Sequence, residues 1–395
     1  MTLLLASVTG PDEAALMLAH GADIIDLKDP SNGALEALAP DVVRATVAAI
    51  HGRRPVSAVT GNLPMEPEVI VAAVETMART GVDYVKVGLF PGPERQACVR
   101  ALASPARTTK IIGVMFADCG ADNDLVKVMA GCGFAGAMLD TSDKRAGGLL
   151  DCMDVASLRE FVGACRGYGM MTGLAGSLEA PDVPRLLLLA PDYLGFRGAL
   201  CVGRDRSARI DPASVGVIRE LIPFDPHSAA SRDATVAKVD YRLLAARGYS
   251  VDPVGADAAT DRIFVRDFVV PARIGAYARE HGKSQNVRFN VDVKVLRASH
   301  APEDMRDVFS YDVITDGIRM IVAQEHIALV EMLAERIAAL VLTHPRVASA
   351  TVRVEKLDVG PGAVGVEIVR EHRPATAKVH HLFPVAAAES DPKAT

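Results

Sequence analysis

Three lysines in this sequence stand beside aspartates on short apolar runs, a combination suited to amine chemistry on a carbonyl group. Lys28 lies in the run DIIDLKDP, Lys86 in DYVKVGL, and both Asp140 and Lys144 in AMLDTSDK. A lysine that is walled by apolar side chains and crowded by another cation has a lowered pKa and attacks a carbonyl as the free amine. A second lysine can then move protons, Asp140 can hold an ammonium group, and Lys144 can neutralise developing charge. The alternative is a set of structural salt bridges.

Two glycine turns further along the chain are suited to binding an anion. In GLAGSL an apolar run enters a turn at Gly176, and Ser177 can cap the helix that follows. Arg197 and Gly198 repeat the theme after the next apolar run. Exposed backbone N–H groups at such turns bind phosphates, so we expect a phosphorylated substrate. Two ordinary tight turns are the alternative. Three later residues are either surface charges or phosphate contacts: Asp205, Arg206 and Arg209.

These residues must be positioned by a regular alternation of strands and helices over residues 1–222. The apolar runs predict strands at 3–8, 23–28, 56–60, 83–88, 110–116, 135–140, 168–174 and 192–197. The helical patterns lie at 11–20, 38–51, 66–80, 94–103, 122–132, 153–166, 178–190 and 211–221. Such alternation predicts a parallel sheet, and this number of units in this length favours a closed (β/α)₈ TIM barrel.

A doubly wound open sheet is the alternative fold, but its G-x-G-x-x-G nucleotide signature is missing after the first strand. In a barrel the chemistry lies at the C-terminal ends of the strands. This rule selects the following residues: Lys28, Thr60, Lys86, Asp118, Asp140, Gly176 and Arg197.

The second half of the chain has a different pattern, which predicts an antiparallel α+β domain over residues 262–372. Strands are expected at 263–266, 286–295, 347–356 and 364–370, and helices at 311–323 and 327–343. This order argues for an antiparallel sheet with helices on one face. Residues 223–261 read as a linker with one helical segment at 234–247, and residues 373–395 as a disordered tail with one strand candidate at 378–385.

Composition excludes several classes of protein. The net charge of -6 and the lack of a basic run give no footprint for nucleic acid. No apolar run approaches the roughly 20 residues of a membrane helix, and the N-terminus lacks the basic leader of a signal peptide. The six cysteines show no C-x-x-C spacing and predict reduced thiols in a cytoplasmic protein. No histidine spacing predicts a metal site, and an amine mechanism requires no cofactor.

Six motifs resemble the (5-formylfuran-3-yl)methyl phosphate synthases of methanofuran biosynthesis, in the same order and across the whole first domain: DIIDLKDP, PVSAVTGN, DYVKVGL, AMLDTSDK, GLAGSL and LGFRGALCVGRDRSARID. The resemblance implies a barrel that joins two molecules of glyceraldehyde 3-phosphate and closes them to a furan aldehyde phosphate. It implies that Lys28 forms the Schiff base, that Lys86 is the proton acceptor, and that Asp140 and Lys144 complete the site. The loop around Asp118 departs from the family pattern.

The second half resembles dihydroneopterin aldolase, an enzyme of the tunnelling fold, in the motifs IGAYARE, FSY, LVEMLA and RVEK. The resemblance implies that Glu331 anchors a pterin ring through paired hydrogen bonds. It implies that Tyr311 and Lys356 handle protons in a retro-aldol step and that Glu280 lies near the substrate. Glu331 read without the resemblance is a solvated acid in the first turn of a helix. Two departures from the family pattern are Phe309-Ser310 before the tyrosine and Leu357 after the lysine.

Three functional hypotheses follow. The first is a bifunctional enzyme acting on a triose phosphate in the barrel and on a pterin in the second domain. The second keeps the barrel chemistry and makes the second domain a structural module that assembles the chain into a homo-oligomer, since tunnelling-fold domains form rings. The third is a class I aldolase that acts on another sugar phosphate.

Overall fold

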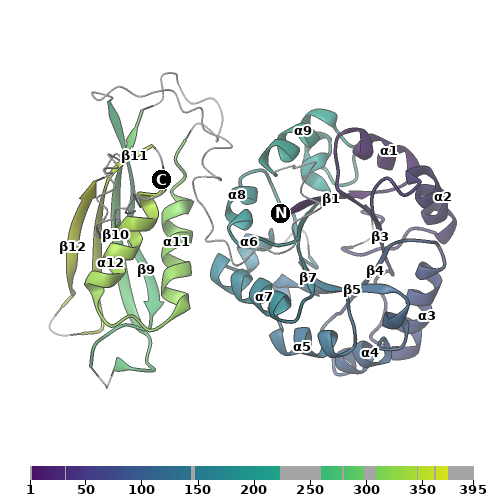
Figure 1. Cartoon of the computed structure of the whole chain (residues 1–395), viewed down its shortest axis with the longest axis horizontal. Helices are drawn as coiled ribbons and strands as arrows, with labels where there is room; N and C mark the ends of the chain where they lie inside the picture. The colour runs from purple at the N-terminus through teal and green to yellow at the C-terminus, as the bar shows by residue number, and fades with distance from the viewer. Residues whose placement is uncertain are drawn as a thin grey trace, which may run out of the picture.

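The structure is a computed structural model that describes residues 2–31, 33–143, 147–222, 259–277, 280–297, 308–344, 346–359 and 362–371. It contains a closed barrel of eight strands and a separate four-stranded sheet (Figure 1). The predictions for Lys144, for the linker helix at 234–247 and for the tail at 373–395 with its strand lie outside the described residues. Among the helices described, none is both long and apolar enough to cross a membrane.

The barrel strands follow one another around the barrel in chain order. They are β1 (Leu3–Val8), β2 (Ile24–Leu27), β3 (Val56–Val59), β4 (Tyr84–Gly88), β5 (Lys110–Phe116), β6 (Gly136–Asp140), β7 (Met171–Leu174) and β8 (Tyr193–Phe196). All neighbours are parallel, and β1 pairs with both β2 and β8. The sheet is therefore closed, which confirms the barrel and rules out the open sheet.

Helices surround the barrel on its outside (Figure 1). They are α1 (Pro11–Ala19), α2 (Pro40–Ile50), α3 (Pro67–Ala78), α4 (Arg95–Ala101), α5 (Asn123–Gly131), α6 (Leu149–Cys152), α7 (Val155–Gly167), α8 (Asp182–Leu187) and α9 (Pro212–Leu221). Four of them have a proline in the first turn, where the missing N–H costs nothing and the fixed φ suits a helix. The short helix α6 is additional to the prediction. The expectation that Ser177 caps the next helix is wrong, because α8 begins at Asp182 after Pro181.

The barrel interior is polar in one layer. The strand register places Ser7 opposite Asp26 and Asp26 opposite Ser57, so these three side chains share a level inside the barrel. The ring of Tyr193 lies beneath them and fits there because residue 173 is a glycine: a Cβ on Gly173 would lie 2.2 Å from this ring. The interior thus combines a large aromatic side chain with a glycine that has none, and this leaves room for the buried charged groups.

The second sheet is antiparallel, with the strand order β12-β11-β10-β9. Its strands are β9 (Thr260–Ala272), β10 (Gln285–Leu296), β11 (Val347–Lys356) and β12 (Val364–Glu371), and its helices are α11 (Asp312–Gln324) and α12 (Val330–Val341). The two helices lie on one face of the sheet (Figure 1) and share with it a buried core that includes Phe289 and Ile337. The predicted α+β order is confirmed.

Strand β9 is longer than its predicted four residues because a bulge interrupts the alternation that the prediction relied on. The register shifts between Phe289 and Val291, so two residues of β9 face one residue of β10. Asp267 lies in this bulge with a φ of 48°, and its N–H donates to the side-chain oxygen of Asn290.

Helix α11 also contacts the barrel and joins the two parts of the chain (Figure 1). Arg185 of α8 donates to both carboxylate oxygens of Asp316 on α11, at 2.6 and 3.0 Å. Met320, one turn further along, packs against the apolar cluster of the barrel. The second domain is thus docked on the α7–α8 side of the barrel through α11.

Candidate active sites

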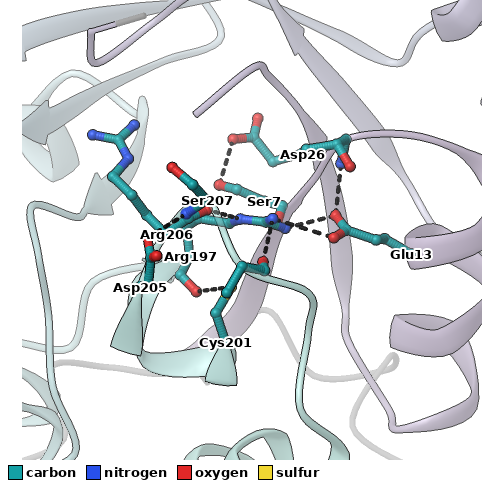
Figure 2. Close-up of polar contacts among 10 residues, drawn as sticks. Ser7, Glu13, Asp26, Arg197, Cys201, Asp205, Arg206 and Ser207 are labelled. Atoms are coloured by element: carbon teal, nitrogen blue, oxygen red, sulfur yellow. Dashed lines mark hydrogen bonds and ion pairs between the residues drawn. The ribbon is translucent and has the colours of Figure 1, made fainter. Parts of the chain in front are cut away.

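A buried ion pair lies inside the barrel between β4 and β2. The Nζ atom of Lys86 is 2.8 Å from Oδ1 of Asp26, and their side chains are 2% and 0% exposed. Asp26 also accepts from the hydroxyls of Ser57, at 2.6 Å, and Ser7, at 3.1 Å, the latter drawn in Figure 2. The prediction of Lys86 at a strand end is corrected here: it lies two residues before the end of β4, below the mouth of the barrel.

Burial controls the protonation of this pair. Burial lowers the pKa of Lys86, the charge of Asp26 opposes this shift, and the charge of Lys28 adds to it, leaving the pKa below its ordinary value. Burial raises the pKa of Asp26, but the charges of Lys86 and Lys28 and the hydrogen bonds outweigh it, so this carboxyl is ionised. Lys86 therefore gives up its proton more readily than a solvated lysine and is suited to act as a base.

A second pair spans the mouth of the barrel. Lys28 directly follows β2, and its Nζ lies 3.7 Å from Oδ2 of Asp140, the last residue of β6. The other oxygen of Asp140 accepts from the N–H of Thr141 at 2.8 Å, which fixes the carboxylate. Both residues are buried, Lys28 being 8% exposed. The structure thus brings the predicted residues Lys28, Lys86 and Asp140 into one network of charges.

Asp26 and its two serine partners are site residues that the sequence interpretation missed. Asp26 precedes Lys28 by two positions on the same strand, and this spacing places two side chains on one face of a strand. That spacing is a signal in the sequence for Asp26. The two serines offer no such signal, because they lie 19 and 31 residues from Asp26 and only the register brings them close.

An apolar cluster lies inside the barrel beside Gly88, the last residue of β4. The loop after β2 turns back into the barrel and buries Leu35, which is 2% exposed. Phe90 and Phe116 stack beside it with their ring centroids 4.5 Å apart. The strand that carries Lys86 therefore ends against an apolar cluster.

Asp118 shapes the loop that leads to Lys144. Its carboxylate accepts from the N–H groups of Ser142, at 3.0 Å, and Asp143, at 3.1 Å, and from the hydroxyl of Ser142. Burial raises the pKa of Asp118, but these hydrogen bonds outweigh it and hold the pKa below its ordinary value. Its visible role is thus to hold the loop.

Arg197 is already occupied by protein acceptors (Figure 2). Its two Nη atoms contact the carboxylate of Glu13 at 2.6 and 3.2 Å, and also the carbonyls of Ser7 at 3.2 Å and Ala208 at 3.1 Å. Its Nε donates to the carbonyl of Arg206 at 2.9 Å. A guanidinium has five N–H donors, so this set uses all of them. Arg197 ties the loop after β8 to β1 and to α1, and a direct bond to phosphate would have to replace one of these contacts.

The glycine turns present free backbone donors at the same mouth. Gly176 has a φ of 121°, and a Cβ there would lie 2.9 Å from a side-chain carbon of Thr141, so glycine is required. Ser177 follows with a φ of 48°. Within the part of the chain that the structure describes, no hydrogen bond uses the N–H groups of Gly176, Ser177 or Gly198. These groups point to an anion site, as predicted, although no contact with an anion tests it.

A second candidate site lies in the second domain. Lys356, the last residue of β11, forms an ion pair with Glu280, which also accepts from the side chain of Gln285 and the N–H of Tyr277, both at 3.1 Å. These three donors lower the pKa of Glu280 to about 2. Gly275 has a φ of 136°, and a Cβ there would lie 2.2 Å from the Glu280 carboxyl, so this close approach requires glycine.

Glu331 and Tyr311 lie at the N-terminal ends of the two helices. Glu331 is exposed in the first turn of α12, and Tyr311 precedes α11 with 61% of its surface exposed. The bridge between Ile274 and Ile327 brings the strand end before Glu280 next to the segment that leads into α12. Of the four residues predicted for this site, Glu280 and Lys356 thus form a buried pair, and Tyr311 and Glu331 have exposed side chains.

Comparison with known proteins agrees with the two halves of the structure. The sequence profile of the family described as 4-HFC-P synthase matches residues 4–219. This chain belongs to the 4-HFC-P synthase family. The profile described as dihydroneopterin aldolase matches residues 263–369. The 4-HFC-P synthase part therefore contains both lysine–aspartate pairs, and the aldolase-like part contains Glu280 and Lys356.

Relatives of the 4-HFC-P synthase part occur in archaea and bacteria. A Methylorubrum extorquens protein, named as a candidate (5-formylfuran-3-yl)methyl phosphate synthase, is 44% identical over 228 residues, covering 58% of this chain and 94% of that protein. The (5-formylfuran-3-yl)methyl phosphate synthase of Methanosarcina mazei is 33% identical over 219 residues, covering 52% and 93%.

A solved relative matches the aldolase-like part. The crystal structure of dihydroneopterin aldolase from Burkholderia thailendensis bound to guanine is 34% identical and covers 28% of this chain and 91% of that chain, with a TM-score of 0.26.

Proposed function

We propose that the barrel forms (5-formylfuran-3-yl)methyl phosphate from two molecules of glyceraldehyde 3-phosphate through a Schiff base on Lys28. The observation that carries this proposal is the shared network of Lys28, Asp140, Lys86 and Asp26 at and below the barrel mouth. The names of the relatives support the product. The overall change releases one phosphate and two waters, so the atoms balance without an oxidant or a reductant.

The residues divide the work by position. The amine of Lys28 attacks the aldehyde carbon and loses water to give an iminium ion, with Asp140 holding the cation at 3.7 Å in the resting site. The iminium ion acidifies the neighbouring C–H bond, and Lys86 takes that proton because burial has lowered its pKa. Lys144 is proposed to neutralise charge from the loop that Asp118 holds. The N–H groups of Gly176, Ser177 and Gly198 are proposed to bind phosphate, with Arg197 keeping the loop that contains Gly198 in place.

Borohydride trapping tests this mechanism. The protein is incubated with glyceraldehyde 3-phosphate and borohydride and the adduct is mapped by peptide mass spectrometry, while an untrapped sample is scanned for the ultraviolet absorbance of a furan. A reduced adduct on Lys28, with furan in the untrapped sample, supports the synthase. The Lys28→Ala variant should lose both signals, and Lys110→Ala, an exposed lysine at the start of β5, should keep them. An adduct without furan indicates an aldolase acting on another sugar phosphate, and no adduct on Lys28 refutes the amine mechanism.

We further propose that the second domain is a pterin aldolase within a homo-oligomer. The buried Glu280–Lys356 pair supports a catalytic role, because a module that serves assembly alone has no need of it. Tyr311 is proposed to handle protons with Lys356, and the exposed Glu331 to anchor the pterin ring. Lys356→Ala should abolish cleavage of dihydroneopterin, and Lys294→Ala, an exposed lysine on β10, should not. If Lys356→Ala still cleaves dihydroneopterin, the role proposed for Lys356 is refuted; if the wild-type protein does not cleave it at all, the domain is a structural module.

The domain boundaries and location complete the proposal. We assign residues 1–222 to the barrel, 223–261 to a linker, 262–372 to the aldolase-like domain and 373–395 to a tail. All six cysteines are free, which supports a cytoplasmic location.

A further inference from the structure

Arg206 occupies a position at the barrel mouth that the proposed mechanism does not use. It lies in the loop after β8, and one of its Nη atoms donates to the carbonyl of Gly33, in the loop after β2, at 2.9 Å. Its side chain therefore reaches from the loop of one strand to that of another over the edge of the mouth. Its own carbonyl is held by Arg197, which fixes the start of the side chain.

The two arginines of this loop differ in what they bind. Figure 2 shows Arg197 pointing to Glu13 and Arg206 leaving in another direction. Every N–H of Arg197 meets a protein acceptor. Among the residues that the structure describes, the guanidinium of Arg206 makes one hydrogen bond and forms no ion pair with a carboxylate. Arg197 is thus a structural tie, and most donors of Arg206 are unused within the described residues.

The surroundings of Arg206 call for an anion. The side chain is partly buried, and this burial lowers the pKa of Arg206; Asp140 opposes the shift, Arg197 adds to it, and Asp29 opposes it. Asp140 is therefore near enough to act on Arg206 through its charge, which sets the guanidinium on the Lys28–Asp140 side of the mouth. A partly desolvated cation without a paired carboxylate is stabilised by an anion that enters its fork of donors.

The loop that carries Arg206 is also the loop of a predicted phosphate turn. It begins at Gly198, whose N–H has no acceptor among the residues that the structure describes, and Arg204 links it to the neighbouring β7 loop through an ion pair with Glu179 at 2.6 Å. The β7 loop contains Gly176 and Ser177. The guanidinium of Arg206 and the free backbone donors therefore belong to two loops that are joined to each other.

We propose that Arg206, and not Arg197, is the side chain that binds the phosphate of the substrate and selects phosphorylated over unphosphorylated trioses. This inference rests on the proposed function of the barrel. Gly33 holds one donor of Arg206 in place, and the remaining donors form a fork that matches two phosphate oxygens. Bound phosphate then sits beside the aldehyde-binding Lys28 and not in the surrounding solvent.

The test compares Arg206→Met with Arg209→Met in the full chain. Arg209 lies in the same loop and is exposed, so it is a matched control for net charge. Calorimetry with inorganic phosphate should show binding weakened about 10- to 100-fold in Arg206→Met, the usual loss for a charge-assisted contact, and unchanged in Arg209→Met. The KM for glyceraldehyde 3-phosphate should rise by a similar factor. Formation of the borohydride-trapped adduct on Lys28 with unphosphorylated glyceraldehyde, a step that needs no phosphate, should be the same in Arg206→Met, Arg209→Met and the wild-type protein.

The outcomes separate this inference from the proposed function. Unchanged phosphate affinity and KM in Arg206→Met overturn the role of Arg206 even if furan forms. Equal losses with phosphorylated and unphosphorylated triose overturn it too, because they indicate that Arg206 only braces the loops. If wild-type protein forms no furan, the proposed function fails, and calorimetry with phosphate still decides whether Arg206 binds the anion. Arg206→Lys, which keeps the charge but loses the fork, should recover part of the affinity.

Discussion

The buried pair of Lys86 and Asp26 makes a quantitative prediction for the variant Asp26→Asn. The amide keeps the shape of the carboxylate but removes its charge, leaving the ammonium of Lys86, 2% exposed, without a counter-ion. At 2.8 Å and an effective dielectric constant of about 20 the attraction is about 6 kcal/mol. Measured costs of breaking one partner of a buried pair are about 3–5 kcal/mol. We expect a loss of this size in the stability of the barrel at pH 7, and a loss of activity.

The penalty has a ceiling that depends on pH. Lys86 can always escape it by releasing its proton, which costs about 1.4 kcal/mol for each pH unit below its ordinary pKa of 10.5. These costs, about 5 kcal/mol at pH 7 and about 1.4 kcal/mol at pH 9.5, are upper limits, because the lowered pKa of Lys86 means that the wild-type protein already bears part of them. The folded protein binds fewer protons than the unfolded chain between the lowered pKa and 10.5, so stability rises with pH in this window. Asp26→Asn lowers the folded pKa further and widens the window.

Hydrogen exchange followed by mass spectrometry suits this test because it reports the two domains separately. At pH 7, peptides of β2 and β4 should lose protection in Asp26→Asn, while those of β10 and β11 should not. Near pH 9.5 most of the loss should disappear. Ser57→Ala is the matched control: it removes one 2.6 Å hydrogen bond to the same carboxylate but no charge, and should cost about 1 kcal/mol at both pH values. An equal loss at both pH values in Asp26→Asn would refute the argument from a stranded ammonium.

Three further variants test other contacts. Asp316→Ala removes the carboxylate that docks α11 on the barrel, so calorimetry should resolve separate unfolding of the two domains, and one unchanged transition would contradict this. The lowered pKa of about 2 means that ionised Glu280 stabilises the fold above pH 4.5, and that this stabilisation is lost progressively down to pH 2. Lys356→Met should therefore be less stable than wild type at neutral pH, and its stability, followed by circular dichroism, should change less between pH 4.5 and pH 2. Gly176→Ala places a side chain at a residue with a φ of 121°, so it should lower the free energy of unfolding by about 1–3 kcal/mol and raise KM. Gly163→Ala is the control: this position in α7 has open space for a Cβ, so the substitution should leave the stability unchanged or raise it.

Local patterns in the sequence were enough to predict the order and type of most elements. The barrel strands are short apolar runs buried on both faces, and four of the helices have a proline in the first turn. The errors occur where a local pattern is interrupted. Strand β9 contains a charged bulge at Asp267, and helix α8 begins at Asp182, after Pro181, and not at residue 178 as predicted.

The sequence predicted residues that the structure brings close together, but it did not identify the buried partner of Lys86. Lys28 and Asp140 follow or end strands, so the barrel rule identifies them directly. Lys86 lies before the end of β4, and in the sequence its partner Asp26 is one polar residue in an apolar strand. Only the register of the strands brings these two residues together. The protein acceptors of Arg197 were not predicted, because neither Glu13 nor the carbonyls that bind it are close to it in sequence. Contacts between distant segments carry no signal in a single sequence.

Burial makes two similar ion pairs chemically different. In the barrel, the side chains of Lys86 and Asp26 are 2% and 0% exposed. Burial lowers the pKa of Lys86 by more than the charge of Asp26 raises it, so the ammonium group loses its proton more readily than a solvated lysine. In the second domain, the pair of Lys356 and Glu280 lies nearer the surface, and its main effect is to keep the carboxyl ionised. A lysine–carboxylate pair therefore lowers the pKa of its lysine in one domain and lowers the pKa of its carboxyl to about 2 in the other. Depth in the fold, more than the identity of the residues, decides which group can move a proton.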